Sequence, residues 1–216
     1  AEFAVLIGFT TFFIGYGLIP WLGGSVIGLV GADEPRYAQV AREMLARHDF
    51  ITPVLYGKPW LEKPALYYWR AMFAFKDFGV HDWSARIPSG EFAWILVFLI
   101  FLHMRRFRPG GQLDAALITV SCAAIIGFAR GASTDMQLAA PFCIGMLGWY
   151  AWYETDKKFW LFDLYFFGGA ATLAKGPVAP FLAFCIIFLF AALRKEWSLL
   201  RRTIWMPGVI LYLAMV

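Results

Sequence analysis

The charged residues of this chain are distributed unevenly, and that distribution limits the folds available to it. Residues 33–86 contain 15 of the 34 charged side chains, whereas residues 3–32 contain none. One bilayer crossing needs about 20 consecutive apolar residues, so the N-terminal stretch is long enough for one. Only 16% of all residues are charged, against about a quarter in an ordinary soluble domain. The chain is therefore expected to be a polytopic integral membrane protein.

Apolar segments between the charge clusters predict an all-α fold with about seven transmembrane helices. The first lies within residues 3–32, and the last begins near Thr203 and is still apolar at Val216. We therefore expect the last helix to be incomplete and residues 1–216 to form the N-terminal part of a transmembrane domain, with the C-terminal spans and any soluble domain absent. The other five helices are expected at residues 85–104, 112–131, 136–153, 159–174 and 176–193.

Short basic clusters give the expected orientation. Because Lys and Arg accumulate in cytoplasmic loops, we expect the N-terminus inside and residues 31–90 to form the first loop on the outer face of the membrane. Clusters beside spans are not the continuous basic face of a nucleic-acid-binding protein, so nucleic acid is not an expected partner. The clusters follow the second and sixth expected helices and consist of Arg105, Arg106, Arg108, Arg194, Lys195, Arg201 and Arg202.

Cysteine and histidine positions predict no disulfide framework and no compact metal motif. The cysteines lie inside apolar runs, where small buried side chains are expected, and the histidines lack ligand spacing. These residues are Cys122, Cys143, Cys185, His48, His81 and His103.

The outer loop begins with a predicted amphipathic helix. Asp33 and Pro35 are typical of a helix start, with Asp33 as an N-cap. Apolar residues then recur at helical spacing on one face for about four turns, which suits a helix lying in the membrane interface. On the opposite face, Glu43 and Arg47 have the spacing of an i,i+4 ion pair.

A second interfacial helix is expected after Lys63-Pro64. It is rich in aromatic residues, which we expect to act mostly as membrane-interface anchors. They are Tyr67, Tyr68, Trp69, Phe73, Phe75 and Phe78. The connection between the two helices, residues 52–64, contains three prolines and one glycine, so it is expected to be stiff and to present Glu62 and Lys63 at a fixed place.

The sequence of this loop resembles that of a known family. Residues 33–38, Asp-Glu-Pro-Arg-Tyr-Ala, are followed by Arg-Glu-Met at 42–44 and by Lys-Pro-Trp-Leu-Glu-Lys-Pro at 58–64. Together they resemble the first periplasmic loop of polytopic glycosyltransferases with the GT-C fold, in the branch of lipid A aminoarabinose transferases and protein O-mannosyltransferases. Residues 129–135 and 173–177 also resemble this family, so the similarity extends over essentially the whole chain.

The resemblance implies an enzyme that moves a sugar from a polyprenyl-phosphate carrier to a lipid, glycan or protein acceptor. It also implies that the transfer takes place at the outer, periplasmic face of the cell inner membrane. Asp33 matches the family's essential loop aspartate, whose carboxylate suits a general base. Lys63 matches a lysine that contacts the carrier phosphate, and an ammonium group suits that charge. Further members of the phosphate-binding rim are Arg36, Arg130 and Lys175, and further acidic candidates are Glu34 and Asp135.

Glu62 matches a residue of a divalent metal site in the aminoarabinose branch. A carboxylate suits Mg²⁺ or Mn²⁺ and also serves Zn²⁺. One carboxylate is not a site, and the family's further ligands would lie beyond Val216. Glu62 can equally well be interpreted as a structural glutamate at the surface. Lys63 can likewise be interpreted as an interfacial lysine that binds membrane lipid headgroups.

Two other functions fit the same composition. A catalytically inactive accessory subunit of a larger membrane complex, with protein subunits as partners, would retain this scaffold without turnover. A secondary transporter fits less well, because transporters place ionisable residues at the bilayer midplane, whereas charge gathers here at one interface. The length of the open reading frame would distinguish the enzyme from the accessory subunit.

Overall fold

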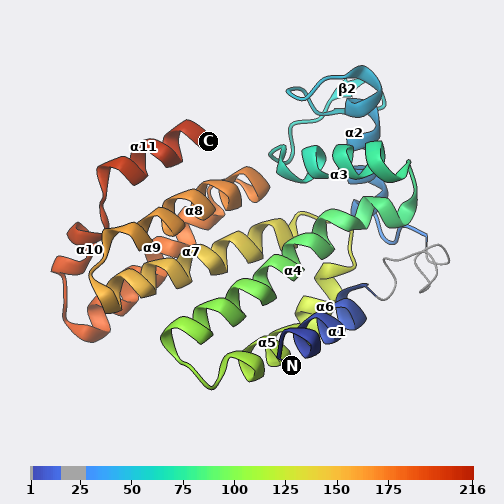
Figure 1. Cartoon of the computed structure of the whole chain (residues 1–216). Helices are drawn as coiled ribbons and strands as arrows, with labels where there is room; N and C mark the ends of the chain where they lie inside the picture. Colours follow the sequence, from blue (N-terminus) through green and yellow to red (C-terminus); the bar gives the residue numbers. More distant parts are fainter. Residues whose placement is uncertain (1, 16–27) are drawn as a thin grey trace. The chain divides into compact units, whose positions relative to one another are not determined.

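The computed structural model describes residues 2–15 and 28–216, and the chain divides into two compact units, residues 1–137 and 138–216. In the first unit, α2 and α3 pack together beside a small β-hairpin (Figure 1). The elements of this unit are α1 (Glu2–Gly15), α2 (Asp33–Arg47), β1 (Val54–Leu55), β2 (Lys58–Pro59), α3 (Leu66–Phe78), α4 (Asp82–Phe107), α5 (Gln112–Ser121), α6 (Ala123–Ala129) and the first turn of α7 (Asp135–Thr155).

The second unit is a bundle of helices around the rest of α7. Its elements are a 3₁₀ turn at Lys158–Trp160, α8 (Leu161–Lys175), α9 (Val178–Arg194), the short α10 (Ser198–Thr203) and α11 (Met206–Met215). Its buried cluster is mostly aromatic and aliphatic: Trp149, Trp152, Leu161, Ile187, Ala191 and Leu199. Helix α11 lies close to α8 at Gly208. A Cβ atom placed on Gly208 would lie only 2.2 Å from the ring of Tyr165. Only glycine fits that crossing without a shift.

The expected helix at residues 112–131 is broken into α5 and α6. The two helices meet at Cys122, whose backbone is extended, and their axes differ by 63°. Just before the break, the hydroxyl groups of Thr119 and Ser121 donate to the carbonyl oxygens of Ala115 and Ile118. Such backward bonds compete with the helical ladder and bend helices. Hydropathy alone does not reveal this break, because both halves are apolar.

The number of membrane spans remains a prediction. Among residues 2–15 and 28–216, only α4 is by itself long and apolar enough to cross a bilayer, and α5 with α6 is a second candidate if the bent pair forms one span. Helices α1, α9 and α11 are apolar but shorter. Much of the expected first span, residues 16–27, lies outside the described residues.

Helices α2 and α3 begin within two residues of the predicted positions, but the prediction for the aromatic side chains of α3 was partly wrong. Tyr67 and Tyr68 are completely buried, and Phe75 is nearly so, whereas Phe73 and Phe78 are exposed. The buried rings pack against the apolar face of α2, which includes Tyr37. These rings therefore join the helices to each other, and they are not anchors in a membrane interface.

The cysteines also differ from expectation. All three have free thiols, and none of them is buried. Cys143 and Cys185 lie on α7 and α9, whose apolar residues face outward as well as inward, and Cys122 lies at the break between α5 and α6. An apolar sequence context therefore did not imply burial, because surface helices of an integral membrane protein are apolar on both faces.

Candidate functional site

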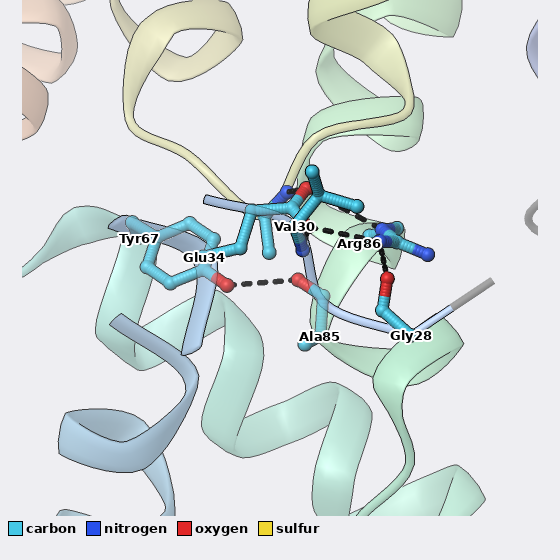
Figure 2. Close-up of polar contacts among 7 residues, drawn as sticks. Gly28, Val30, Glu34, Tyr67, Ala85 and Arg86 are labelled. Atoms are coloured by element: carbon cyan, nitrogen blue, oxygen red, sulfur yellow. Dashed lines mark hydrogen bonds and ion pairs between the residues drawn. The ribbon is translucent and has the colours of Figure 1, made fainter. Parts of the chain in front are cut away.

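Glu34 accepts hydrogen bonds from the segment just before its own helix and from two parts of the chain that are distant in sequence. Its carboxylate oxygens accept from the backbone N–H of Val30 (2.7 Å), from that of Ala132 (2.7 Å) and from Nη2 of Arg86 (2.8 Å). Figure 2 shows Glu34 and Arg86 facing each other, with Arg86 also donating to the carbonyl oxygen of Gly28 at 2.7 Å. The start of α2, the start of α4 and the loop before α7 are thereby joined at one carboxylate.

Burial gives this ion pair its importance. The side chain of Arg86 is 4% exposed and that of Glu34 is 13% exposed. Burial alone would raise the pKa of Glu34, but its hydrogen bonds from Arg86, Val30 and Ala132 lower it below the ordinary value overall. Charged Glu34 is thus the form that the fold requires. Arg86 was missed by the sequence analysis, although an arginine at the edge of an apolar segment is itself a signal of a paired or functional group.

Asp33, the predicted general base, has a different environment from its neighbour. It is the first residue of α2, and its side chain is 64% exposed. It makes no capping hydrogen bond, because Ala32 occupies the N-cap position, so the N-cap prediction was wrong. Its Oδ1 accepts a hydrogen bond from Nη1 of Arg36 at 3.2 Å.

Arg36 connects Asp33 to the second part of the motif. Its Nη1 lies 3.7 Å from Oε2 of Glu62, and its guanidinium group stacks over the ring of Trp60 at 5.5 Å. Glu62 in turn lies 3.3 Å from Nζ of Lys63 through its other oxygen. The side chains of Asp33, Arg36, Glu62 and Lys63 therefore form one continuous row of alternating charges.

The hairpin that precedes this row is anchored to α2. Strands β1 and β2 pair antiparallel across a two-residue turn, Tyr56-Gly57, in which both residues have positive φ (51° and 76°). The carboxylate of Glu43 accepts hydrogen bonds from the backbone N–H groups of both turn residues, at 2.8 and 3.1 Å. The expected Glu43–Arg47 pair is absent from the described ion pairs, in which Arg47 contacts Asp49. The sequence analysis therefore missed the role of Glu43.

Tyr37 lies beneath the charged row. It is 3% exposed and packs against Tyr67 and Tyr68. Burial, followed by the negative charges of Asp33 and Glu62, raises the pKa of Tyr37 to about 12, and Asp135 adds to the effect. Tyr37 is therefore neutral over the physiological range, and its phenol group can only donate or accept hydrogen bonds there.

The remaining predicted residues occupy three other positions. Asp135 is the first residue of α7, in the first unit. Arg130 donates from Nη2 to the carbonyl oxygen of Phe13 at 2.6 Å, which joins the end of α6 to α1. Lys175 is the last residue of α8, in the second unit. The structure thus brings Asp33, Arg36, Glu62 and Lys63 together but gives Arg130 a contact within the scaffold.

The described residues do not form a metal site by themselves. Among residues 2–15 and 28–216, no three His, Cys, Asp or Glu side chains are close enough to hold an ion. Glu62, the predicted ligand, is instead shared between Arg36 and Lys63. A divalent cation needs several oxygen or nitrogen ligands, and these positive neighbours oppose it.

A helical membrane domain whose first loop presents an exposed carboxylate beside a row of cationic side chains has the features of a GT-C-type glycosyltransferase. The crystal structures of ArnT from Cupriavidus metallidurans show the same fold. Its apo form matches this chain with a TM-score of 0.85 at 24% identity, over 97% of this chain and 40% of that one. Its complex with undecaprenyl phosphate matches with the same score over 96% and 40%.

The family model for dolichyl-phosphate-mannose-protein mannosyltransferases matches residues 62–216, more than half of the chain, and the chain belongs to that family. An undecaprenyl phosphate-alpha-4-amino-4-deoxy-L-arabinose arabinosyl transferase of Pseudomonas aeruginosa is 28% identical over 190 residues, covering 85% of this chain and 35% of the relative. An uncharacterised protein of Aquifex aeolicus is 27% identical over 172 residues, covering 78% and 34%. The resemblance predicted from the loop motifs is confirmed, and the chain spans about a third of the length of these relatives.

Proposed function

We propose that this chain contributes part of the active site of a membrane glycosyltransferase, which moves a sugar from a polyprenyl-phosphate carrier to an acceptor hydroxyl or phosphate group. The observation that carries the proposal is the row Asp33–Arg36–Glu62–Lys63, which places a solvent-exposed carboxylate and two cations on one face of the first loop. Membership of a glycosyltransferase family supports the reaction class. An inactive accessory subunit is not favoured by these findings.

Asp33 is the general base in this proposal. A base must reach the acceptor nucleophile and take its proton. Of the three carboxylates of α2, Glu34 is nearly buried and is held by Arg86 and two backbone N–H groups. Glu43 is held by the turn N–H groups of the hairpin. Asp33 is the one whose described partner is a single side chain, Arg36, and whose surface is mostly open.

Lys63 and Arg36 bind the carrier phosphate in this proposal. During transfer the carrier phosphate departs with negative charge, and fixed cations stabilise that charge. Lys63 is half-buried, and its described ion-pair partner, Glu62, is shared with Arg36. A phosphate group would therefore compete with one carboxylate for two cations. The roles of Arg130, Asp135 and Lys175 remain predictions from the family resemblance.

The acceptor and the membrane face belong to the proposal as well. The relatives' names specify undecaprenyl phosphate-linked aminoarabinose as their donor, which supports a bacterial polyprenyl carrier here. A lipid acceptor is proposed from the resemblance of the first loop to that of lipid A aminoarabinose transferases. The arrangement of basic clusters supports the outer face of the inner membrane for the loop. A divalent ion on Glu62 would require additional ligands, which the family resemblance places beyond Val216.

The test is a transfer assay with the purified protein, a radiolabelled undecaprenyl-phosphate sugar and lipid A. Asp33→Asn is expected to lower turnover at least about 100-fold, as loss of a general base does, while the affinity for undecaprenyl phosphate stays within about twofold. Lys63→Ala is expected to weaken that affinity about tenfold or more. Wild-type turnover in Asp33→Asn would refute the role of Asp33 as general base. Wild-type affinity for undecaprenyl phosphate in Lys63→Ala would refute the role of Lys63 in phosphate binding.

A further inference from the structure

Glu43 makes a set of contacts that a surface glutamate of a helix does not need. Its two carboxylate oxygens accept from the N–H groups of Tyr56 and Gly57, which are 13 and 14 residues further along the chain. The side-chain amide of Gln39 donates to it at 2.7 Å. Burial is the largest single influence and would raise the pKa of Glu43, but the hydrogen bonds from Gly57, Gln39 and Tyr56 together lower it below its ordinary value. The charged form of Glu43 is therefore the one that holds the turn.

The turn needs an external anchor. Tyr56 adopts the left-handed conformation that is costly for any residue with a Cβ atom, and the two strands are only two residues each. A hairpin of this size is not stable alone in water. Its inner strand packs through Val54, which is 1% exposed. Leu55 and Trp60 also pack against the buried cluster between α2 and α3. Glu43 adds the attachment at the turn itself, through charge-assisted hydrogen bonds that are stronger than neutral ones.

The position of the hairpin determines where Lys63 is held. The backbone N–H of Trp60 donates to the carbonyl oxygen of Pro53 at 2.8 Å, which extends the pairing past β2. Only two residues lie between Trp60 and Lys63, and Pro64 restricts the backbone conformation of Lys63. A shift of the Tyr56-Gly57 turn therefore moves Lys63 relative to Asp33, because little free chain is available to absorb it.

We propose that Glu43 is a positioning residue, which fixes the hairpin turn and thereby sets the place of the Lys63 ammonium group for an anionic phosphate. Glu43 itself touches no substrate in this arrangement. The consequence for phosphate binding rests on the proposed function, whereas the consequence for the environment of Lys63 does not. The two can therefore be tested separately.

The first measurement requires no carrier. Acylation of lysines by an N-hydroxysuccinimide ester is followed by mass spectrometry in wild type, Glu43→Ala and Glu43→Gln. Lys63 is half-buried against Glu62, so Glu43→Ala is expected to raise its acylation rate about fivefold or more, while Lys76 on α3 is unchanged. Glu43→Gln is expected to be intermediate, because an amide oxygen still accepts from a turn N–H. An unchanged Lys63 rate in Glu43→Ala would overturn the proposal.

The second measurement is a double-mutant cycle for binding of undecaprenyl phosphate in detergent micelles. Glu43→Ala is expected to weaken binding about tenfold when Lys63 is present and less than twofold in the Lys63→Ala background. Equal losses in both backgrounds would show that Glu43 acts by general destabilisation and would overturn the positioning role. If Lys63→Ala alone has no effect on binding, the phosphate-binding role of Lys63 fails, and the acylation result decides the role of Glu43.

A matched control is available in the same connection. Asp49 also accepts two backbone N–H bonds, from Ile51 (2.8 Å) and Thr52 (3.1 Å), but these precede the hairpin. Asp49→Ala is expected to leave the Lys63 acylation rate and the carrier affinity within about twofold of wild type. An effect as large as that of Glu43→Ala would show that any loosening of residues 49–64 reaches Lys63, and the specific role of Glu43 would be refuted.

Discussion

Replacing Glu34 with glutamine isolates the contribution of the buried ion pair with Arg86. The substitution preserves side-chain size but removes the charge that Arg86 faces. It also replaces one carboxylate oxygen with an NH₂ group, which then faces either the N–H of Ala132 or the N–H groups of Val30 and Arg86. Arg86 is 4% exposed, so its charge is left in the protein interior. Breaking a buried pair from one side typically costs about 3–5 kcal/mol. We expect Glu34→Gln to fall in or just below this range, because the Gly28 carbonyl oxygen still accepts from Arg86.

Glu91→Gln is the matched control for this prediction. Glu91 accepts a two-pronged hydrogen bond from Arg70, which joins α3 to α4, so the pair has the same chemistry. Its side chains are 36% and 39% exposed, however, and pairs in contact with solvent contribute about 0–1 kcal/mol. Glu91→Gln is therefore expected to cost no more than about 1 kcal/mol.

Hydrogen exchange of the backbone amides gives the assay, because Val30 and Ala132 donate directly to Glu34. A loss of 3 kcal/mol corresponds to roughly a 100-fold faster exchange, since each 1.4 kcal/mol is a factor of ten. The same acceleration should be absent at α9, in the second unit. If Glu34→Gln and Glu91→Gln change exchange by similar small factors, burial is not what makes the Glu34–Arg86 pair important, and the reasoning fails.

Three further outcomes are expected. The fold lowers the pKa of Glu34 below its ordinary value of 4.5. The stability that charged Glu34 adds is therefore present above about pH 4.5 and is lost as the pH falls through the folded-state pKa. Between pH 6 and pH 3, the free energy of unfolding should fall less in Glu34→Gln than in wild type. Tyr67→Phe should lower the free energy of unfolding by about 1 kcal/mol, because the Tyr67 hydroxyl donates to the Ala85 carbonyl oxygen at 2.9 Å (Figure 2). Tyr68→Phe should leave it unchanged, because the buried Tyr68 hydroxyl has no hydrogen-bond partner among the described residues. Equal costs for the two substitutions would contradict this. Gly208→Ala should destabilise the second unit by about 1–3 kcal/mol, because the added methyl group overpacks against Tyr165. Thermal unfolding of the variant measures this loss. An unchanged stability would mean that α11 moves freely against α8.

Local rules were sufficient to predict the helices of the outer loop. An acidic residue and a proline mark the start of α2, and Pro64 marks the start of α3, so both helices begin within two residues of expectation. The break between α5 and α6 was not predictable in this way. It depends on two hydroxyl groups and one extended residue within a segment that is apolar throughout.

Composition also failed to separate two uses of aromatic residues. Interfacial anchors and buried packing rings are the same residue types, and the spacing on α3 fits both. The decision is made by α2, which contributes Tyr37 and Met44 to a cluster that covers Tyr67 and Tyr68. Because that contact joins separate helices, it becomes visible only once the fold is known.

The carboxylates of α2 show why the candidate site could be located from the sequence but not divided into roles. Helical spacing predicted that Glu43 would pair with Arg47 four residues away. Its carboxylate instead accepts hydrogen bonds from the turn N–H groups of Tyr56 and Gly57. Two charge-assisted bonds to a fixed backbone outweigh an exposed ion pair, which contributes at most about 1 kcal/mol and requires two long side chains to be ordered.

The adjacent pair Asp33 and Glu34 follows from helix geometry. With 3.6 residues per turn, consecutive side chains point about 100° apart, so a helix that turns Glu34 toward Arg86 must direct Asp33 elsewhere. Glu34 then has three donors and a lowered pKa, which makes it a poor proton acceptor at neutral pH. Asp33 keeps an open surface and a single described partner, Arg36. The buried ion pair therefore fixes the start of α2 in the one orientation that leaves Asp33 available, so the structural role of Glu34 and the proposed catalytic role of Asp33 depend on each other.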